Sequence, residues 1–378
     1  MLRLRHRFLV LAATLLLAAS FSPLALAQEI PTQISDAEFW RMITDFSEPG
    51  GVFRSDNFVS NETTLQVVIP ELQKNISAGG VYVGVGPEQN FTYIVALQPK
   101  IAFIVDIRRQ NLIQHLMYKA IVELSADRAE FFSRLFSRPQ PEDANTSDTP
   151  GDLISAFRRV GRDPDLYAEN LLAIKEHLTI HHGFELTPED EKSLAYISDA
   201  FFQGGPDITY SYIPGRRRRP GDPTFWQLLG ATDRNGLNHG YLANEENFQA
   251  LKRLQENNLI VPLVGNFAGD KTLLSVGQYV KDHSAKVTTF YVSNVEQYLF
   301  QQAGDWSRFY TNVAELPLDS TSTFIRTVFN NLLVRAYTQG DARVATLICP
   351  MEDFIKAFSS GEIGLYRDIL ARSRPTTQ

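Results

Sequence analysis

The spacing of apolar residues predicts helices in the first part of the chain. Ser35, with a glutamate three residues later, is a capping-box signature, and it opens an amphipathic helix that stops at a Pro-Gly-Gly sequence. A second helix is predicted over residues 62–76, with Pro70 kinking or dividing it. Residues 28–78 are therefore expected to form an N-terminal helical segment.

After residue 78, short continuous apolar runs alternate with helical stretches. Strands are predicted at 81–83, 101–105, 259–264 and 287–292, and the runs at 323–329 and 344–349 could close the same sheet. Helices are predicted at 88–97, 109–124 and 270–283, and again from residue 296 onward. Continuous apolar strands that alternate with helices indicate a parallel sheet covered on both faces. The predicted fold class is therefore α/β, with a Rossmann-like, mostly parallel sheet.

The middle third of the chain lacks this alternation. Helical periodicity recurs over 129–135, 152–160, 171–178 and 189–201, broken by polar loops. Residues 126–256 are therefore predicted to be a large, mainly helical insertion in a single domain that spans 28–378. Within the sheet, the strand at 81–85 is expected to lie centrally beside the strand at 101–106. It should also pair with the strand at 287–292, which creates a crevice at the carboxyl ends of the strands.

The N-terminus has the pattern of a secretory signal peptide. Arginines within residues 3–7 precede an apolar stretch at 8–21, and an Ala-Leu-Ala sequence ending at Ala27 suits a signal peptidase. Residues 1–27 are therefore predicted to be removed, and the exported protein, periplasmic or secreted, should begin near Gln28. The alternative is an uncleaved anchor. No later segment offers the roughly 20 apolar residues of a transmembrane helix, so none is expected in the mature chain.

Charge and cysteine content narrow the classes of partner. The formal net charge of −7 becomes −10 when the three arginines of the predicted signal peptide are removed. This acidic balance gives no general attraction to nucleic acid or to anionic lipid, and no nucleic-acid partner is expected. Cys349 is the only cysteine, so no intrachain disulfide can form. Because it lies in an apolar run, it is predicted to be a core residue rather than a nucleophile.

The strongest chemical signal is a Gly-x-Gly sequence at the end of the first predicted strand. Gly84 and Gly86 would let the backbone turn tightly and approach a ligand, and Asp106, about 20 residues further on, would accept ribose hydroxyl protons. The third glycine of the dinucleotide fingerprint is missing. Glu88 would repel a pyrophosphate at this helix start, which argues against NAD or FAD. The alternative is that the two glycines only shape the turn.

Three sequence blocks resemble an uncharacterised bacterial family with a class I methyltransferase-like Rossmann fold. They lie within residues 80–124 and 241–299, and include Val-Tyr-Val-Gly-Val-Gly, Leu-Ile-Val-Pro-Leu-Val-Gly-Asn-Phe-Ala-Gly and Tyr-Val-Ser-Asn-Val-Glu-Gln-Tyr-Leu. The blocks keep the order expected of strands one to four. The resemblance implies S-adenosylmethionine as cofactor and methyl transfer to an unknown substrate.

The same resemblance assigns roles to individual residues. Gly84 and Gly86 would hold the methionine portion of the cofactor, and Asp106 would bind the ribose. Asn266 would contact the adenine amino group, and Asn294 would face the methyl acceptor. Related sequences carry an aspartate at the position of Asn266, but an amide oxygen can still accept a hydrogen bond.

Two further segments offer weaker candidates. His239 lies in a stretch predicted to be an active-site lid, and it is the preferred general base if one exists, because histidine titrates near neutrality. Arg216 to Arg219 could clamp an anionic group, since arginine binds phosphate with two parallel hydrogen bonds. A solvated loop is the commoner explanation for such a run.

Three histidines are candidate metal ligands. His177, His181 and His182 include an i, i+4 pair on a predicted helix, a spacing that can bind zinc. The glutamate of His-Glu-x-x-His is absent and no third ligand is evident in the sequence. A polar helix face is therefore favoured, and no metal is predicted.

Three functions remain in competition. The first is a methyltransferase-like enzyme, and the second is a non-catalytic extracytoplasmic Rossmann module that binds a small ligand. The third is a scaffold that engages a protein partner through the helical insertion. A retained cavity with Asp106 facing it would favour the first two, because both require a small-molecule ligand.

Overall fold

A computed structural model of the protein describes residues 29–213, 221–329 and 343–375. The predicted signal peptide and the run from Arg216 to Arg219 lie outside these residues.

The apolar runs form one six-stranded sheet. Its strands are β1 Val81–Gly84, β2 Ile101–Asp106, β3 Ile260–Val264, β4 Val287–Ser293, β5 Thr323–Val328 and β6 Ala345–Pro350. Their order is β3-β2-β1-β4-β5-β6, and all neighbours are parallel except β5 and β6. The predicted pairing is confirmed, because β1 lies between β2 and β4. Cys349 is buried in β6, as predicted for a core residue.

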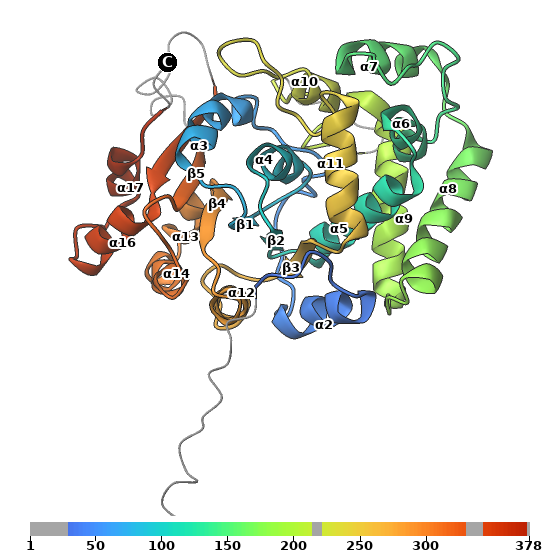
Figure 1. The fold of residues 1–378 in the computed structure, drawn as a ribbon. Coiled ribbons are helices and arrows are strands. Elements are labelled where there is room, and N and C mark those ends of the chain that lie inside the picture. The colour runs from blue at the N-terminus through green and yellow to red at the C-terminus, as the bar shows by residue number, and fades with distance from the viewer. Residues whose placement is uncertain (1–28, 214–220, 330–342, 376–378) are drawn as a thin grey trace, which may run out of the picture.

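Helices cover both faces of this sheet, which confirms the Rossmann-like α/β class (Figure 1). They are α2 Asp36–Phe46, α3 Ile69–Asn75, α4 Gln89–Leu97, α5 Arg109–Leu124, α6 Arg128–Phe136, α7 Pro150–Arg159, α8 Pro164–Glu176, α9 Pro188–Gly204, α10 Phe225–Leu229, α11 Glu245–Glu256, α12 Thr272–Asp282, α13 Val295–Leu299, α14 Asp305–Ala314, α16 Met351–Ser359 and α17 Tyr366–Arg372. In Figure 1, α4 lies above the strands, and α12 and α14 lie below them.

The N-terminal segment follows its capping signals. The Ser35 hydroxyl accepts a hydrogen bond from the backbone N–H of Glu38, which starts α2. The second predicted helix is divided into a 3-10 turn, Leu65–Val68, and α3, with Pro70 in the first turn of α3. Proline fits there because the first turn of a helix does not use its backbone N–H groups. Residues 47–64 form an irregular loop between the two helical parts.

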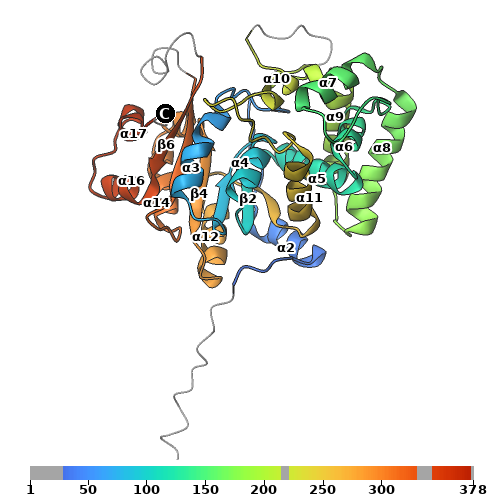
Figure 2. The ribbon, with the colours of Figure 1, turned by 45° about the horizontal axis from the view of Figure 1, so that its top comes forward.

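The segment between α5 and β3 is helical where it is described. The four helices predicted there are present as α6 to α9 with shifted ends, and α10 and α11 are additional. An isolated β-bridge joins Thr209 and Thr224. Figure 2 shows α6 to α9 gathered on one side of the molecule, next to α5 and α11.

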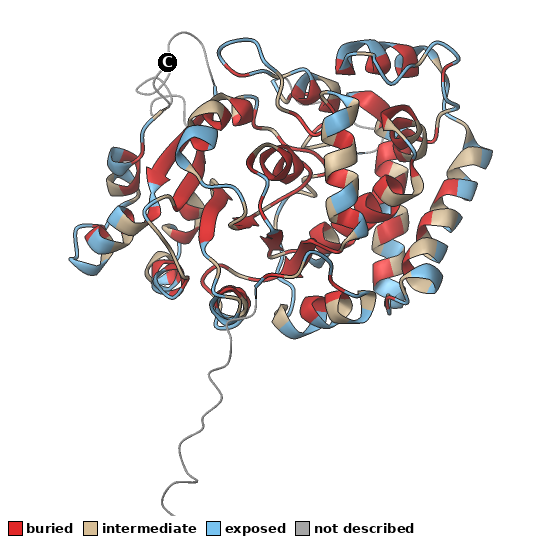
Figure 3. Cartoon of the chain, viewed as in Figure 1, coloured by how far each residue is buried: buried red, intermediate tan, exposed pale blue. Residues whose placement is uncertain are grey.

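Helix α4 is enclosed on nearly all sides at the centre of the fold. All of its residues except Ala96 are buried, as its red colour in Figure 3 shows. A helix that is buried all round must satisfy its polar side chains internally. Asn90 does so, because its Nδ2 donates to the carbonyls of residues 85–87 at 2.7–3.2 Å and its Oδ1 accepts from Tyr82 Oη at 2.8 Å. Asn90 thereby closes the turn between β1 and α4.

The close contact of Gly84 with this asparagine makes a first prediction. A Cβ at position 84 would lie 2.0 Å from Asn90 Oδ1, so Gly84→Ala should displace the side chain that closes the turn. Overpacking of this kind costs about 1–3 kcal/mol of unfolding free energy, which urea denaturation can measure. Gly161→Ala is the matched control, since no atom lies within 4 Å of its added Cβ. Equal stability of the two variants would contradict the prediction.

Candidate functional site

A cavity of about 790 Å³ lies at the carboxyl ends of β1, β2, β3 and β4. This volume falls in the range of roughly 300–1,000 Å³ that is usual for ligand sites. The loop of residues 52–62 and residues 210–213 complete its wall, together with the start of α13. The cavity therefore occupies the crevice at which the strand order reverses, where ligands bind in open α/β sheets.

Most of the residues assigned from the sequence meet in this cavity. Those that line it are Gly86, Asp106, Asn266 and Asn294. Gly84 and His239 are not among its lining residues. The four lining residues come from the ends of four different strands, in the arrangement that the resemblance implies.

The two glycines of the turn have different roles. Gly86 has φ of +82° and lines the cavity, so it needs the conformation that glycine adopts without strain. Its carbonyl accepts from Asn90 and lies 2.9 Å from His115 Nε2. Gly84 instead makes room for Asn90, as described above. Position 86 thus requires glycine because of its backbone conformation at the cavity. Position 84 requires glycine because a side chain there would collide with Asn90.

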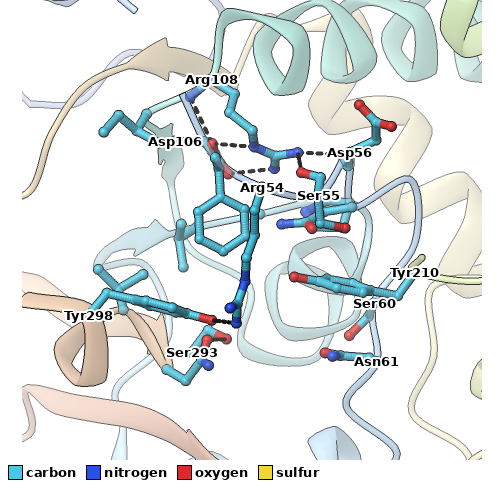
Figure 4. Close-up of a pocket in the computed structure, with 18 of the residues that line it drawn as sticks. Arg54, Ser55, Asp56, Ser60, Asn61, Asp106, Arg108, Tyr210, Ser293 and Tyr298 are labelled. Carbon is cyan, nitrogen blue, oxygen red and sulfur yellow. Dashed lines mark hydrogen bonds and ion pairs between the residues drawn. The ribbon is translucent and has the colours of Figure 1, made fainter. Parts of the chain in front are cut away.

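Asp106 is already engaged by a neighbouring arginine (Figure 4). Arg108 donates to it through Nε at 3.0 Å and Nη2 at 2.9 Å, and the backbone N–H of Arg108 adds a third bond at 2.9 Å. Both side chains are buried. Arg108 Nη1 also donates to the backbone carbonyls of Ser55 and Asp56. The pair thus ties the loop of residues 52–62 to the end of β2, and Arg108 already engages both carboxylate oxygens of Asp106.

A second arginine and two tyrosines face the open part of the cavity. In Figure 4, Arg54 extends toward Tyr298, and its Nη2 donates to the tyrosine Oη at 3.2 Å. The ring of Tyr210 lines the cavity as well. Burial raises the pKa of Tyr210 to about 12, so its hydroxyl stays neutral and can donate a hydrogen bond. Aromatic faces of this kind suit a planar ring or a cation.

A buried acid and amide occupy the wall near the glycine turn. Glu62 accepts hydrogen bonds from Tyr291 Oη, Ser293 Oγ and Thr327 Oγ1, and burial raises its pKa. Gln89 Nε2 donates to Tyr291 Oη at 3.1 Å, while its Oε1 has no hydrogen-bond partner among the described residues. Gln89 is only 6% exposed. Gln89 Oε1 is therefore the acceptor of this wall that is left without a partner among the described residues.

Glu88 does not have the position that the sequence suggested. Its side chain does not line the cavity and is only 3% exposed, with Oε1 accepting from the backbone N–H of Ser60 at 3.2 Å. Burial raises its pKa to about 8, so the group is mostly protonated near neutral pH. The expected repulsion between Glu88 and a pyrophosphate is therefore wrong. No local sequence signal distinguishes a glutamate that turns inward from one that faces a ligand.

The remaining candidates have structural partners. His239 Nε2 lies 2.9 Å from Asp233 Oδ2, and its backbone N–H donates to Gln66 Oε1. Asn266 Oδ1 accepts from the backbone N–H of Ala268 at 3.0 Å and keeps a second lone pair. Asn294 lies at the start of α13. Of these three, only the two asparagines are placed to contact a ligand in the cavity.

Comparison with known proteins identifies the family to which the chain belongs. The fold and the cavity define a Rossmann-like α/β protein with a small-molecule-sized site. Residues 57–146 and 218–377 match a family described as a domain of unknown function, DUF7790. These segments span more than half of the chain, which therefore belongs to that family. Helices α7 to α9 lie in the intervening stretch. No curated protein matches the chain.

None of the helices in the described part of the chain is both long enough and apolar enough to cross a bilayer.

The burial of Glu88 predicts how the free energy of unfolding depends on pH. Its pKa rises from 4.5 to about 8 on folding, so the folded state keeps a proton that the unfolded chain has lost. The contribution of Glu88 is therefore complete below pH 4.5 and is lost as the pH rises through about 8. Relative to Glu88→Gln, the wild type should lose about 1.4 kcal/mol per pH unit across this interval.

Urea denaturation at several pH values tests this expectation. Glu246→Gln, a change at an exposed residue of α11, is the matched control and should run parallel to the wild type. A constant difference between the wild type and Glu88→Gln at all pH values would show that Glu88 ionises normally.

Proposed function

We propose that the cavity binds S-adenosylmethionine and that the chain is a methyltransferase-like protein. The observation that carries this proposal is the meeting of Gly86, Asp106, Asn266 and Asn294 in one cavity. These positions were assigned one by one from the resemblance, and they are far apart in the sequence. A ligand of this kind spans the crevice, with its amino-acid end beside β1 and its base beside β3.

The chemistry of the wall suits the charges of this cofactor. Its methionine portion carries an ammonium group, and the sulfonium is a second cation. Gln89 Oε1, which has no partner among the described residues, offers an acceptor near Gly86. The rings of Tyr210 and Tyr298 can face a cation. Methyl transfer itself requires little beyond alignment of the acceptor with the sulfonium, and Asn294 borders the space left for that acceptor.

The Asp106–Arg108 pair sets a condition for binding. Both carboxylate oxygens of Asp106 accept from Arg108, so the ribose hydroxyls compete with the guanidinium. Because Arg108 also holds the loop of residues 52–62, its displacement would loosen that loop. This engagement favours the second candidate, a non-catalytic extracytoplasmic module whose small ligand contacts Arg54 and the tyrosines instead.

Two matched variants separate these possibilities. Asp106→Asn and Arg108→Gln both break the same ion pair, but only the first removes the charged acceptor for the ribose. Asp106→Asn should therefore weaken S-adenosylmethionine binding at least about tenfold, since a hydrogen bond to a charged group contributes about 1.5–3 kcal/mol. Arg108→Gln keeps this acceptor and removes the competing guanidinium, so it should lose less affinity than Asp106→Asn even though the loop of residues 52–62 is loosened. Calorimetry with the cofactor and with its demethylated product measures both.

The same titrations can contradict the proposal. Equal weakening in both variants would mean that the ion pair supports the cavity without any ribose contact. Absence of heat with a wild-type protein that melts cooperatively would leave the non-catalytic module as the function. Melting curves of each variant check that loss of binding is not loss of folding.

We further propose that the protein is exported. The tripartite N-terminal pattern supports this, although residues 1–27 lie outside the described part of the structure. Mass spectrometry of protein from the extracytoplasmic fraction should find an N-terminus within a residue or two of Gln28. Recovery of the intact chain, with residue 1 in place on a membrane-bound form, would contradict cleavage.

A further inference from the structure

Three histidines converge at the end of α8. The helix continues into a π-helical turn, His177–His181, and the backbone N–H of His182 donates to the His177 carbonyl at 3.1 Å. A π turn is wider than an α turn, so residues i, i+4 and i+5 come to one side. The three imidazole rings lie 4.7–4.9 Å apart, and one nitrogen from each lies within 4.8 Å of the others. Such π turns are frequent at functional sites.

A buried carboxylate faces two of these rings. Glu123, at the end of α5, has its Oε2 at 2.7 Å from His177 Nε2 and at 2.7 Å from His182 Nε2. Its other oxygen, Oε1, accepts from Lys119 Nζ at 2.5 Å. The Glu123 side chain is only 5% exposed. One oxygen of Glu123 is therefore held in place while the other is directed at two imidazole nitrogens.

The second nitrogen of His182 is fixed by another acid. Asp36 Oδ1 lies 2.8 Å from His182 Nδ1 and also accepts from Asn258 Nδ2. A neutral imidazole carries one N–H, and a carboxylate can only accept. If Nδ1–H donates to Asp36, then Nε2 presents a lone pair to Glu123. That lone pair and the carboxylate oxygen require a cation between them, either a proton or a metal ion.

We propose that His177, His182 and Glu123 form a zinc site, with His181 as its fourth ligand. Imidazole nitrogen and carboxylate oxygen are zinc ligands, at about 2.0–2.2 Å from the metal. Tetrahedral ligands at that distance lie roughly 3.3 Å apart, so the two contacts of Glu123 Oε2 with His177 and His182 need to lengthen by only roughly half an ångström.

The residues around the site are also suited to a metal ion. Asp36 orients His182 in the way that carboxylates orient zinc-bound histidines. The two negative charges of Glu123 and Asp36 outweigh the positive charge of Lys119 by one, which favours a bound cation. His181 is exposed, so an ion can enter from solvent.

The position of the site indicates a structural role. Its ligands come from α5, which packs on the sheet, and from the end of α8. Asp36 belongs to α2. None of these residues lines the cavity at the strand ends. An ion here would fasten the helical insertion to the body of the fold. Because none of its ligands lines the cavity, the site does not depend on the proposed cofactor function.

Metal binding is tested on the full, untagged chain after treatment with a chelator. Titration with Zn²⁺ alone should show one ion per chain, and Co²⁺ should give the visible absorption of a tetrahedral nitrogen and oxygen site. Zn²⁺ should also raise the melting temperature, because it binds only the folded state. Mg²⁺ and Ca²⁺ should do neither, since they prefer sites made of oxygen ligands.

Variants locate the ion. Zinc affinity should fall at least about tenfold in Asp36→Asn, the loss usual when an orienting carboxylate is removed. It should fall further in the double variant His177→Ala, His182→Ala. His181→Ala alters an exposed side chain, so it should weaken zinc binding and leave the metal-free melting temperature unchanged. His283→Ala, a histidine on another helix end, is the control and should bind as the wild type does.

Two results would overturn the assignment. One is a wild-type protein that takes up no zinc. The other is uptake with unchanged affinity in both His181→Ala and the double variant, which would place the ion elsewhere. A cobalt spectrum that stays the same in His181→Ala would remove that residue from the ligand set.

Discussion

The burial of helix α4 on nearly every side is the constraint on which the centre of the molecule depends. Three consecutive polar residues at its start, Glu88, Gln89 and Asn90, are at most 6% exposed and take most of their hydrogen bonds from inside the protein. Asn90 closes the glycine turn, Glu88 receives the backbone N–H of Ser60, and Gln89 donates to Tyr291. One buried helix start therefore shapes the turn, places the loop above it and builds part of the cavity wall.

The sheet could be predicted from the sequence because its signals are local. Continuous apolar runs report burial on both faces, and the strand tips that follow them, such as Asp106 and Asn266, fall at one edge by the geometry of parallel strands. Burial of Glu88 could not be predicted in this way. Its neighbours are Ser60, Tyr118 of α5 and Tyr241, which are far apart in the sequence and come together only in the folded chain. The requirement for glycine at position 84 likewise comes from Asn90, six residues away on the next element.

The parts of the two sites that the sequence did not reveal depend on long-range contacts. Glu62 meets Tyr291 and Thr327 across more than two hundred residues, and no motif surrounds it. The i, i+4 spacing of His177 and His181 was visible, but α-helical geometry points the next residue elsewhere. The π turn returns His182 to the same side, and the acids that face it belong to α2 and α5. A prediction from residue spacing takes the helix to be α-helical throughout, so it cannot detect a π turn.

The crevice and the histidine cluster each contain a buried carboxylate, and these two carboxylates differ in whether their oxygens already have partners. Asp106 has both oxygens satisfied by Arg108, so the crevice is electrostatically complete without a cofactor, and any ligand must offer more than the guanidinium already supplies. Glu123 has one oxygen satisfied by Lys119, and the other faces nitrogens that need a cation between. An empty crevice therefore leaves the fold intact, whereas the histidine cluster must hold a proton or a metal ion. Under the two proposals, a ligand in the crevice would serve binding or methyl transfer, and an ion in the cluster would attach the helical insertion to the body of the fold.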